Sequence, residues 1–264
     1  MSVCTKWTPW GRQMLLCTLV AWSASATAQH NALPDTIAKV KPSVVIVGSY
    51  NPTAAPRFSL RGTGFVVGSG NWVVGNAHVL QAPGTAQPQG QLVVQVRTGP
   101  DSFQTRAAKV LDKDVFHDLT LLQIDGPPVP ALPLADSDRV KEGQELAFMG
   151  FPIGGALGFS SVTHRAMVSS ITQARLPSAQ SGQLNERAIR GLREGNFLIF
   201  QLDATAYPGN SGGPLFDPVS GEVVGVMNMV LLKGARESAL SHPSGISYAI
   251  PARHVREMMA RQRP

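Results

Sequence analysis

A glycine-rich turn reads Gly209-Asn210-Ser211-Gly212-Gly213-Pro214-Leu215 and lies between apolar runs at residues 197–202 and 222–231. Glycine adopts backbone conformations that other residues avoid, so such a turn can expose a hydroxyl and aim backbone N–H groups inward. A nucleophilic serine needs both features, because the N–H groups bind the oxyanion that forms after attack. A glycine-rich serine turn alone is most often only a turn, so the interpretation depends on a matching base.

The candidate base is His78, one of six histidines. A serine hydroxyl becomes nucleophilic when a histidine takes its proton and a carboxylate orients that histidine. His78 follows Asn76-Ala77 at the end of an apolar run, with a small residue directly before the imidazole. His117 and His164 also neighbour expected strands, where a hydrogen-bonded structural histidine is the default interpretation.

The candidate carboxylate is Asp118, which directly precedes the apolar run at residues 119–124. Burial against that run would hold its carboxylate beside an imidazole. A capping role is the structural alternative for Asp118. Asp112 and Asp114 are interpreted as turn residues.

Short apolar runs separated by Gly, Pro or Asn predict an all-β protein. The first set of expected strands is 44–48, 63–68, 72–75, 92–97, 107–111 and 119–124, and a proline-rich joint follows at 126–130. The second set is 145–150, 161–173, 197–202, 213–216, 222–231 and 245–250. Two groups of about six strands indicate two small β-barrels, at about residues 35–125 and 140–250, with a cleft between them.

Helices are expected to be few and short. One is predicted over residues 34–41, and a C-terminal helix is predicted to begin at Pro251. Its apolar stripe of Val255, Met258 and Met259 would dock on the second barrel. Residues 181–195, within a loop at 174–196, form either a short amphipathic helix or a solvated insertion.

The first 28 residues are interpreted as a secretory signal peptide. Basic residues precede a short apolar run, and Ala26-Thr27-Ala28 offers a cleavage site, which leaves a single domain at 29–264. The apolar run is shorter than the ~20 residues that a membrane span needs, so no stable membrane anchor is expected after cleavage. Both cysteines, Cys4 and Cys17, lie in this segment. We therefore expect a mature chain without disulfides.

Composition narrows the classes of function. The chain has 264 residues, of which 43% are hydrophobic and 15% charged, which excludes intrinsic disorder. The formal net charge of +6 comes from scattered residues, so a nucleic-acid partner is not expected. No metal site and no cofactor are expected, because the histidines are dispersed and no His-Glu-x-x-His spacing occurs.

Several motifs together carry a family resemblance. They are Gly-Thr-Gly-Phe-Val-Val at 62–67, Asn-Ala-His-Val at 76–79, Asp-Leu-Thr-Leu-Leu at 118–122 and Asp-Ala-Thr-Ala-Tyr-Pro-Gly-Asn-Ser-Gly-Gly-Pro-Leu at 203–215. Segments 150–154 and 245–251 also match. With His, Asp and Ser in this order, residues 35–258 resemble the trypsin-like serine proteases of the HtrA/Deg type.

The resemblance implies two six-stranded antiparallel barrels of the chymotrypsin type with a short C-terminal helix. His78 and Asp118 would come from the first barrel and Ser211 from the second, and the N–H groups of Gly209 and Ser211 would form the oxyanion hole. Gly75 and Tyr207 depart from the family's usual Thr and Asn. The sequence ends at Pro264, so no PDZ domain is expected. The resemblance also implies a homotrimer.

The substrate pocket is predicted from the same alignment. Thr205 would form its base, and Val226, Met227 and Met229 its wall. An uncharged, apolar pocket predicts aliphatic residues before the cut bond.

The leading hypothesis is an exported serine endopeptidase that acts on unfolded or damaged proteins. We expect it in the periplasm, with the extracellular space as the alternative, and polypeptides as its partners. A second hypothesis is a latent protease fold that serves as a binding or holdase module. An esterase is disfavoured by the His, Asp, Ser order along the chain.

Overall fold

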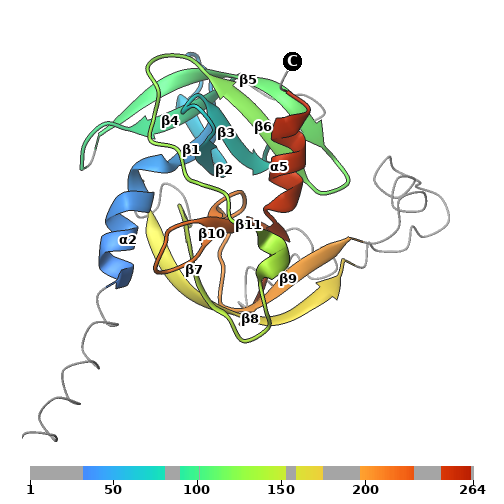
Figure 1. The fold of residues 1–264 in the computed structure, drawn as a ribbon. Coiled ribbons are helices and arrows are strands. Elements are labelled where there is room, and N and C mark those ends of the chain that lie inside the picture. The colour runs from blue at the N-terminus through green and yellow to red at the C-terminus, as the bar shows by residue number, and fades with distance from the viewer. Residues whose placement is uncertain are drawn as a thin grey trace, which may run out of the picture.

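Two closed antiparallel barrels contain the twelve strands of the computed structural model (Figure 1). The structure describes residues 32–80, 90–100, 102–152, 159–174, 197–228 and 245–262. The predicted leader, the segment 181–195 and Met229 lie outside these ranges. No helix among the described residues has the length and apolar character of a membrane span.

The first barrel closes in the strand order β1-β2-β3-β6-β5-β4. Its strands are β1 (Val44–Tyr50), β2 (Phe58–Val67), β3 (Trp72–Asn76), β4 (Gln91–Arg97), β5 (Phe103–Asp114) and β6 (Leu119–Ile124). Each predicted strand is present. The strands β2 and β5 start earlier than predicted, because their first halves are amphipathic and partly exposed.

The second barrel closes in the order β10-β11-β12-β9-β8-β7. Its strands are β7 (Glu145–Gly150), β8 (Val162–Gln173), β9 (Leu198–Asp203), β10 (Pro214–Phe216), β11 (Val223–Asn228) and β12 (Ile246–Pro251). The predicted all-β fold of two six-stranded antiparallel barrels is confirmed.

Three apolar clusters hold the barrels and join them. One is built from first-barrel residues such as Val45, Val66 and Leu122, and another from second-barrel residues such as Phe148 and Leu202. The third cluster combines residues of both barrels with Val40, Val255 and Met258, which belong to two described helices. Adjacent residues of a strand point to opposite faces, so valine-rich strands buried on both sides can serve two clusters at once.

Helix α2 (Ala32–Val40) runs into a 3-10 turn, η2 (Lys41–Ser43), and matches the helix predicted over residues 34–41. Two further 3-10 turns are η3 (Ala77–Leu80) and η4 (Ser137–Arg139). The turn η3 carries His78. Its place directly after β3 fixes that side chain against the rigid first barrel.

Helix α5 (Arg253–Ala260) corrects two predictions. Pro251 is the last residue of β12, where it pairs with Gly225, and the helix begins two residues later. The helix also docks on both barrels rather than on the second alone. Val255 and Met258 are buried in the shared cluster, while Met259 reaches Gly68 of the first barrel.

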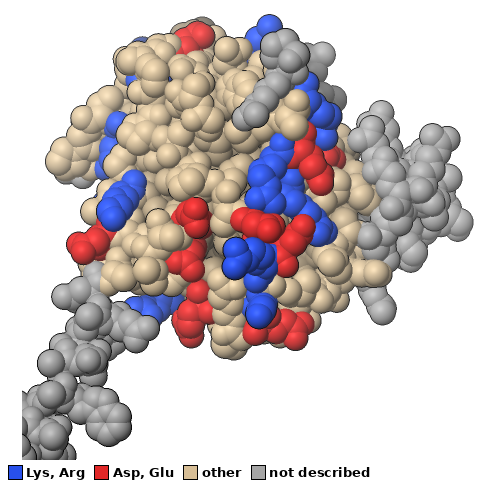
Figure 2. Space-filling view, viewed as in Figure 1, with Lys and Arg blue, Asp and Glu red and all other residues tan. Residues whose placement is uncertain are grey.

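Charged side chains reinforce this docking. Figure 2 shows both signs gathered on the face that carries α5. Three ion pairs contribute: Arg253–Asp138 at 2.9 Å, Arg256–Asp136 at 3.4 Å and Arg261–Asp112 at 3.0 Å. The last one links the helix to β5 of the first barrel, so α5 connects the two barrels at their boundary.

Candidate active site

His78 and Asp118 form a two-point contact within the first barrel. The backbone N–H of His78 donates to Asp118 Oδ1 at 2.9 Å, and His78 Nδ1 lies 2.6 Å from Asp118 Oδ2. The Asp118 side chain is 5% exposed and that of His78 is 20% exposed. A carboxylate held this way accepts a hydrogen bond from Nδ1–H and leaves Nε2 as the proton acceptor. The predicted pairing of these residues is therefore present.

An unusual backbone conformation aims the Asp118 side chain at His78. Asp118 has φ +56°, the only described non-glycine residue with a positive φ. Its carbonyl oxygen accepts hydrogen bonds from the N–H of Ala77, at 3.1 Å, and from Asn76 Nδ2, at 3.0 Å. These contacts stabilise a conformation that costs most residues energy. Asp118 thus holds the imidazole through Oδ2 and the backbone of η3 through Oδ1.

A residue of the second barrel completes the environment of Asp118. Asn228, at the end of β11, donates from Nδ2 to Asp118 Oδ2 at 2.8 Å. Both residues are buried. Sequence reasoning missed Asn228, although a polar residue inside the apolar run 222–231 was a usable signal.

The serine turn lies directly against the end of β3 and requires glycine at two positions. Gly209 has φ +102°, and a methyl group there would overlap the carbonyl oxygen of Phe151. Gly212 has φ +86°, and a methyl group there would overlap the carbonyl oxygen of Thr63 and lie 3.2 Å from Asn76 N. Gly212, the residue after Ser211, therefore packs against Asn76, which precedes His78 by two residues in the chain.

A further contact confirms that the two halves of the site meet. A methyl group built on Gly62 would lie 2.8 Å from Val79 Cγ2 and 3.0 Å from the carbonyl oxygen of Ser211. Gly212 N–H also donates to Met227 O at 2.9 Å, next to Asn228. The structure thus places Ser211 O and Val79, the neighbour of His78, around the same glycine at the boundary of the barrels.

Thr63 of β2 fixes the serine turn from the first barrel. Its Oγ1 donates to Gly209 O at 2.6 Å and accepts from the N–H of Phe151 at 3.0 Å. Its own N–H donates to Ser211 O at 2.9 Å. Thr63 is fully buried, and its supporting role was missed because the contacts join residues far apart in the chain.

The oxyanion hole assigned to the N–H groups of Gly209 and Ser211 stays a prediction. Within the turn, the N–H of Asn210 donates to Tyr207 O, that of Gly212 to Met227 O and that of Gly213 to Asn210 O. This pattern fixes the backbone around the two predicted donors. The turn is therefore rigid where an oxyanion would bind.

The predicted substrate pocket also stays a prediction. Thr205 follows β9 and is partly exposed, whereas Val226 and Met227 are completely buried. Val226 belongs to the cluster shared by both barrels and Met227 to the cluster of the second barrel, so the two side chains point in opposite directions. Met229 is outside the described residues. Thr205 is the pocket residue that the structure leaves accessible.

A second His–Asp pair copies the local geometry of the first. His117 N–H donates to Asp114 Oδ1 at 3.0 Å, and His117 Nδ1 lies 2.7 Å from Asp114 Oδ2. Burial alone would raise the pKa of Asp114, but hydrogen bonds and charge from His117 outweigh it and lower that pKa to about 2. Asp112 and Asp114 lie in β5, so their interpretation as turn residues is wrong.

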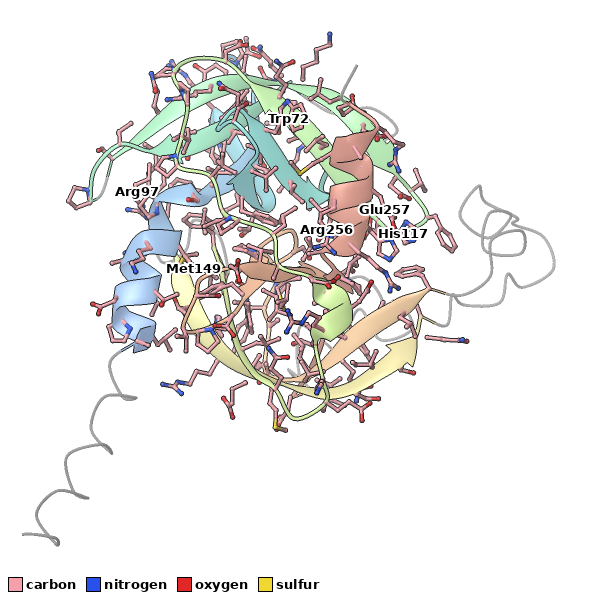
Figure 3. All side chains as sticks on the ribbon, viewed as in Figure 1. Trp72, Arg97, His117, Met149, Arg256 and Glu257 are labelled. Carbon is pink, nitrogen blue, oxygen red and sulfur yellow. The ribbon has the colours of Figure 1, made fainter. Side chains whose placement is uncertain are left out.

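This second pair is structural. The His117 ring stacks on that of His254 in α5, with centroids 3.7 Å apart. Figure 3 shows His117 beside the helix that carries Glu257, and Glu257 Oε2 lies 3.1 Å from His254 Nδ1. Burial, reinforced by the charge of His117, lowers the pKa of His254 to about 4. His117 is thus the hydrogen-bonded structural histidine that its position predicts.

Comparisons with known proteins show the family of this chain. Residues 62–226 match the family described as a trypsin-like peptidase domain. The mitochondrial serine protease HTRA2 of Bos taurus is 32% identical over 90% of this chain and 44% of its own length. A probable periplasmic serine endoprotease, DegP-like, of Marinomonas sp. is 31% identical over 76% of this chain and 35% of its own length. The chain thus spans less than half the length of these relatives.

The fold of this chain is also similar to that of solved HtrA-type protease structures. The HtrA-type protease AlgW, solved with a decapeptide, superposes with a TM-score of 0.62 at 22% identity. The match covers 86% of this chain and 66% of that one. At this identity the likeness concerns the fold, and it supports the double barrel described above.

Proposed function

This chain belongs to the trypsin-like peptidase family, as its resemblance to HtrA-type proteases predicted, and on that premise we propose that it is a serine endopeptidase for unfolded polypeptides. The observation that carries the proposal is the carboxylate of Asp118. It accepts hydrogen bonds from His78 of its own barrel and from Asn228 of the other, beside the turn of Ser211.

In this mechanism Ser211 attacks the peptide carbonyl while His78 takes the hydroxyl proton on Nε2. Asp118 holds the imidazole in the tautomer that presents Nε2 and stabilises the imidazolium that forms. His78 then gives the proton to the leaving amine, and an acyl-enzyme remains on Ser211. Water, activated by His78, hydrolyses this ester and restores the serine.

The N–H groups of Gly209 and Ser211 stabilise the oxyanion in both steps, a role worth about 10²–10³ in turnover per donor. Thr205 contributes to an uncharged pocket for an aliphatic residue before the cut bond. Export is proposed from the leader-like residues 1–28, and the periplasm from the similarity to the probable periplasmic endoprotease of Marinomonas sp.. A trimeric assembly is part of the same proposal by resemblance.

The test compares the purified protein with its Ser211→Ala variant on a permanently unfolded polypeptide. Ser169→Ala, at an exposed serine on β8, is the matched control. We expect cuts by the wild type and the control, and turnover lowered about 10⁶-fold in Ser211→Ala. Mass spectrometry of the products should show aliphatic residues before the cuts, and mostly Lys or Arg there would contradict the proposed pocket.

The latent alternative has its own outcome in this assay. A folded wild type that binds the unfolded polypeptide without cutting it would replace the peptidase with a holdase. N-terminal sequencing of the exported protein tests the leader, with Gln29 expected as the first residue. An N-terminus upstream of the apolar run would contradict export by cleavage.

A further inference from the structure

Arg61 occupies an irregular point in the pairing of β1 with β2. Gly62 pairs with Val47 and Leu60 pairs with Gly48, so Arg61 is the extra residue of a β-bulge. A bulge redirects the side chain of its extra residue, and bulges are common beside active sites. This bulge lies one residue before Gly62, which packs against Val79 and the carbonyl oxygen of Ser211.

The contacts of Arg61 locate it on the His78 side of the site. Its Nη1 donates to the carbonyl oxygen of Leu80 at 2.8 Å, and Leu80 ends the 3-10 turn that carries His78. The next residue, Gly62, packs against Val79 and the carbonyl oxygen of Ser211. The chain neighbour of Arg61 therefore packs against the backbone of Ser211, and Arg61 itself contacts Leu80, two residues after His78.

The charge of Arg61 is uncompensated within the part of the chain that the structure describes. Its other hydrogen bond runs from Nε to Ser49 Oγ at 3.3 Å, and no described carboxylate pairs with it. Nearby acids of the first barrel are engaged elsewhere: Asp118 with His78, Asp114 with His117 and Asp112 with Arg261.

An unpaired, partly buried guanidinium carries a desolvation cost that an anion would offset. Burial lowers the pKa of Arg61, which is the sign of that cost. The planar guanidinium also fits a carboxylate better than any other common anion of a polypeptide, because it donates two parallel hydrogen bonds. The side chain thus suits a carboxylate ligand.

The position of Arg61 on the His78 side of the site indicates which part of a substrate would supply the carboxylate. His78 gives its proton to the leaving amine, so the residues that follow the cut bond lie on the His78 side. We propose, on the basis of the proposed peptidase function, that Arg61 binds a carboxylate of these residues and selects substrates with Asp or Glu shortly after the cut. The chain's terminal carboxylate is a second source of the same group.

The experiment uses pairs of fluorogenic peptides that differ only by Glu or Gln at the first, second or third position after the cut. We expect kcat/KM for the best Glu peptide to exceed that of its Gln partner by roughly tenfold, as a charge-assisted hydrogen bond permits. The ratio should fall towards one in Arg61→Gln and be partly kept in Arg61→Lys. In Arg61→Glu it should invert.

Arg57→Gln is the matched control, because Arg57 is exposed just before the same strand. It should keep the wild-type ratio. Labelling of Ser211 by a fluorophosphonate, together with thermal unfolding, verifies that each Arg61 variant is folded with an intact nucleophile. A second peptide set ends two residues after the cut with a free or an amidated terminus, and selectivity confined to this set assigns the carboxylate to the chain end.

The role of Arg61 is overturned if the wild type cuts the Glu and Gln peptides with equal kcat/KM and also shows no preference between free and amidated ends. The proposed peptidase function is not affected by that result. Selectivity that survives in Arg61→Gln overturns the role of Arg61 as well. If a folded wild type cuts no peptide at all, the proposed function itself fails. The two proposals are thus separated by the wild-type protein alone.

Discussion

The hydroxyl of Thr63 in the first barrel donates a 2.6 Å hydrogen bond to the carbonyl oxygen of Gly209 in the second. The same hydroxyl accepts the N–H of Phe151. One buried side chain therefore controls the carbonyl of the residue whose N–H is proposed to bind the oxyanion. The nucleophile's turn is held from the opposite barrel, and each part of that linkage can be changed by mutation.

Thr63→Val keeps the shape of the side chain but leaves Gly209 O and Phe151 N–H without their partner. We expect kcat to fall at least tenfold with KM changed less than threefold, and stability to fall by about 2 kcal/mol. Thr63→Ser, which restores the hydroxyl, should recover most of kcat. Steady-state kinetics on one peptide measures this, and equal kcat in Thr63→Val and the wild type would show that the hydroxyl does not position the turn.

Asn228→Leu removes the hydrogen bond that the second barrel gives to Asp118. Asp118 keeps its two contacts with His78, so the expected loss is moderate, about tenfold in kcat, or 1.4 kcal/mol. Asn71→Ala, which removes an amide of the β2–β3 turn that donates to Gly126 O at the start of the linker, should leave kcat unchanged. A loss of equal size in both variants would indicate general destabilisation instead of positioning.

Asp118→Asn and Asp114→Asn make a matched pair, because both carboxylates contact a histidine through the same two atoms. In the serine-protease mechanism the amide stabilises the wrong tautomer of the base, so Asp118→Asn should lower kcat about 10⁴-fold. Asp114→Asn should change it less than fivefold, because His117 stacks on α5. Similar losses in both variants would refute the assignment of His78 as the base.

Acid should weaken the attachment of α5. Burial lowers the pKa of His254 to about 4 in the folded protein, whereas its ordinary pKa is near 6.5. Between these values the unfolded chain binds a proton that the folded protein does not. The stabilisation that neutral His254 gives the folded state is therefore complete above pH 6.5 and is lost as the pH falls towards 4. The groups that face it are His117, Arg253 and Glu257. Asp114, with a pKa of about 2, titrates below this window.

Urea unfolding at pH 7 and pH 4.5 measures this effect. We expect the wild type to lose about 2 kcal/mol more than His254→Gln between these values. His164→Gln is the control, because burial also lowers the pKa of His164 but this histidine lies on β8, away from α5. Equal losses in the wild type and in His254→Gln would exclude His254 as the titrating group.

The strands were predictable because their signal is local. The run 119–124 is apolar with turn residues before it, and the structure has β6 at Leu119–Ile124. Asp118 was found for the same reason, since its position before β6 fixes its side chain. Pro251 was misassigned because proline suits the first turn of a helix, yet tertiary pairing with Gly225 keeps it in β12.

The supporting residues could not be predicted because their partners are distant in sequence. Asn228 donates a hydrogen bond to Asp118 of the other barrel, and the apolar residues around Asn228 in the sequence do not indicate this acceptor. Thr63 and Arg61 depend in the same way on the docking of two barrels and on a bulge in one strand. Local patterns predict elements, whereas contacts across the boundary need the assembled molecule.

Because the proposed catalytic groups are divided between two closed barrels, we expect activity to report on the docking of these barrels. A chain in which each barrel has folded separately would keep almost all of its strands and the same circular dichroism spectrum, yet His78 and Ser211 would be apart. We expect fragments separated at residues 126–130 to have turnover only when they reassociate, because one apolar cluster is built from both barrels. Cleavage of a peptide substrate would thus serve as the signal that the two fragments have assembled.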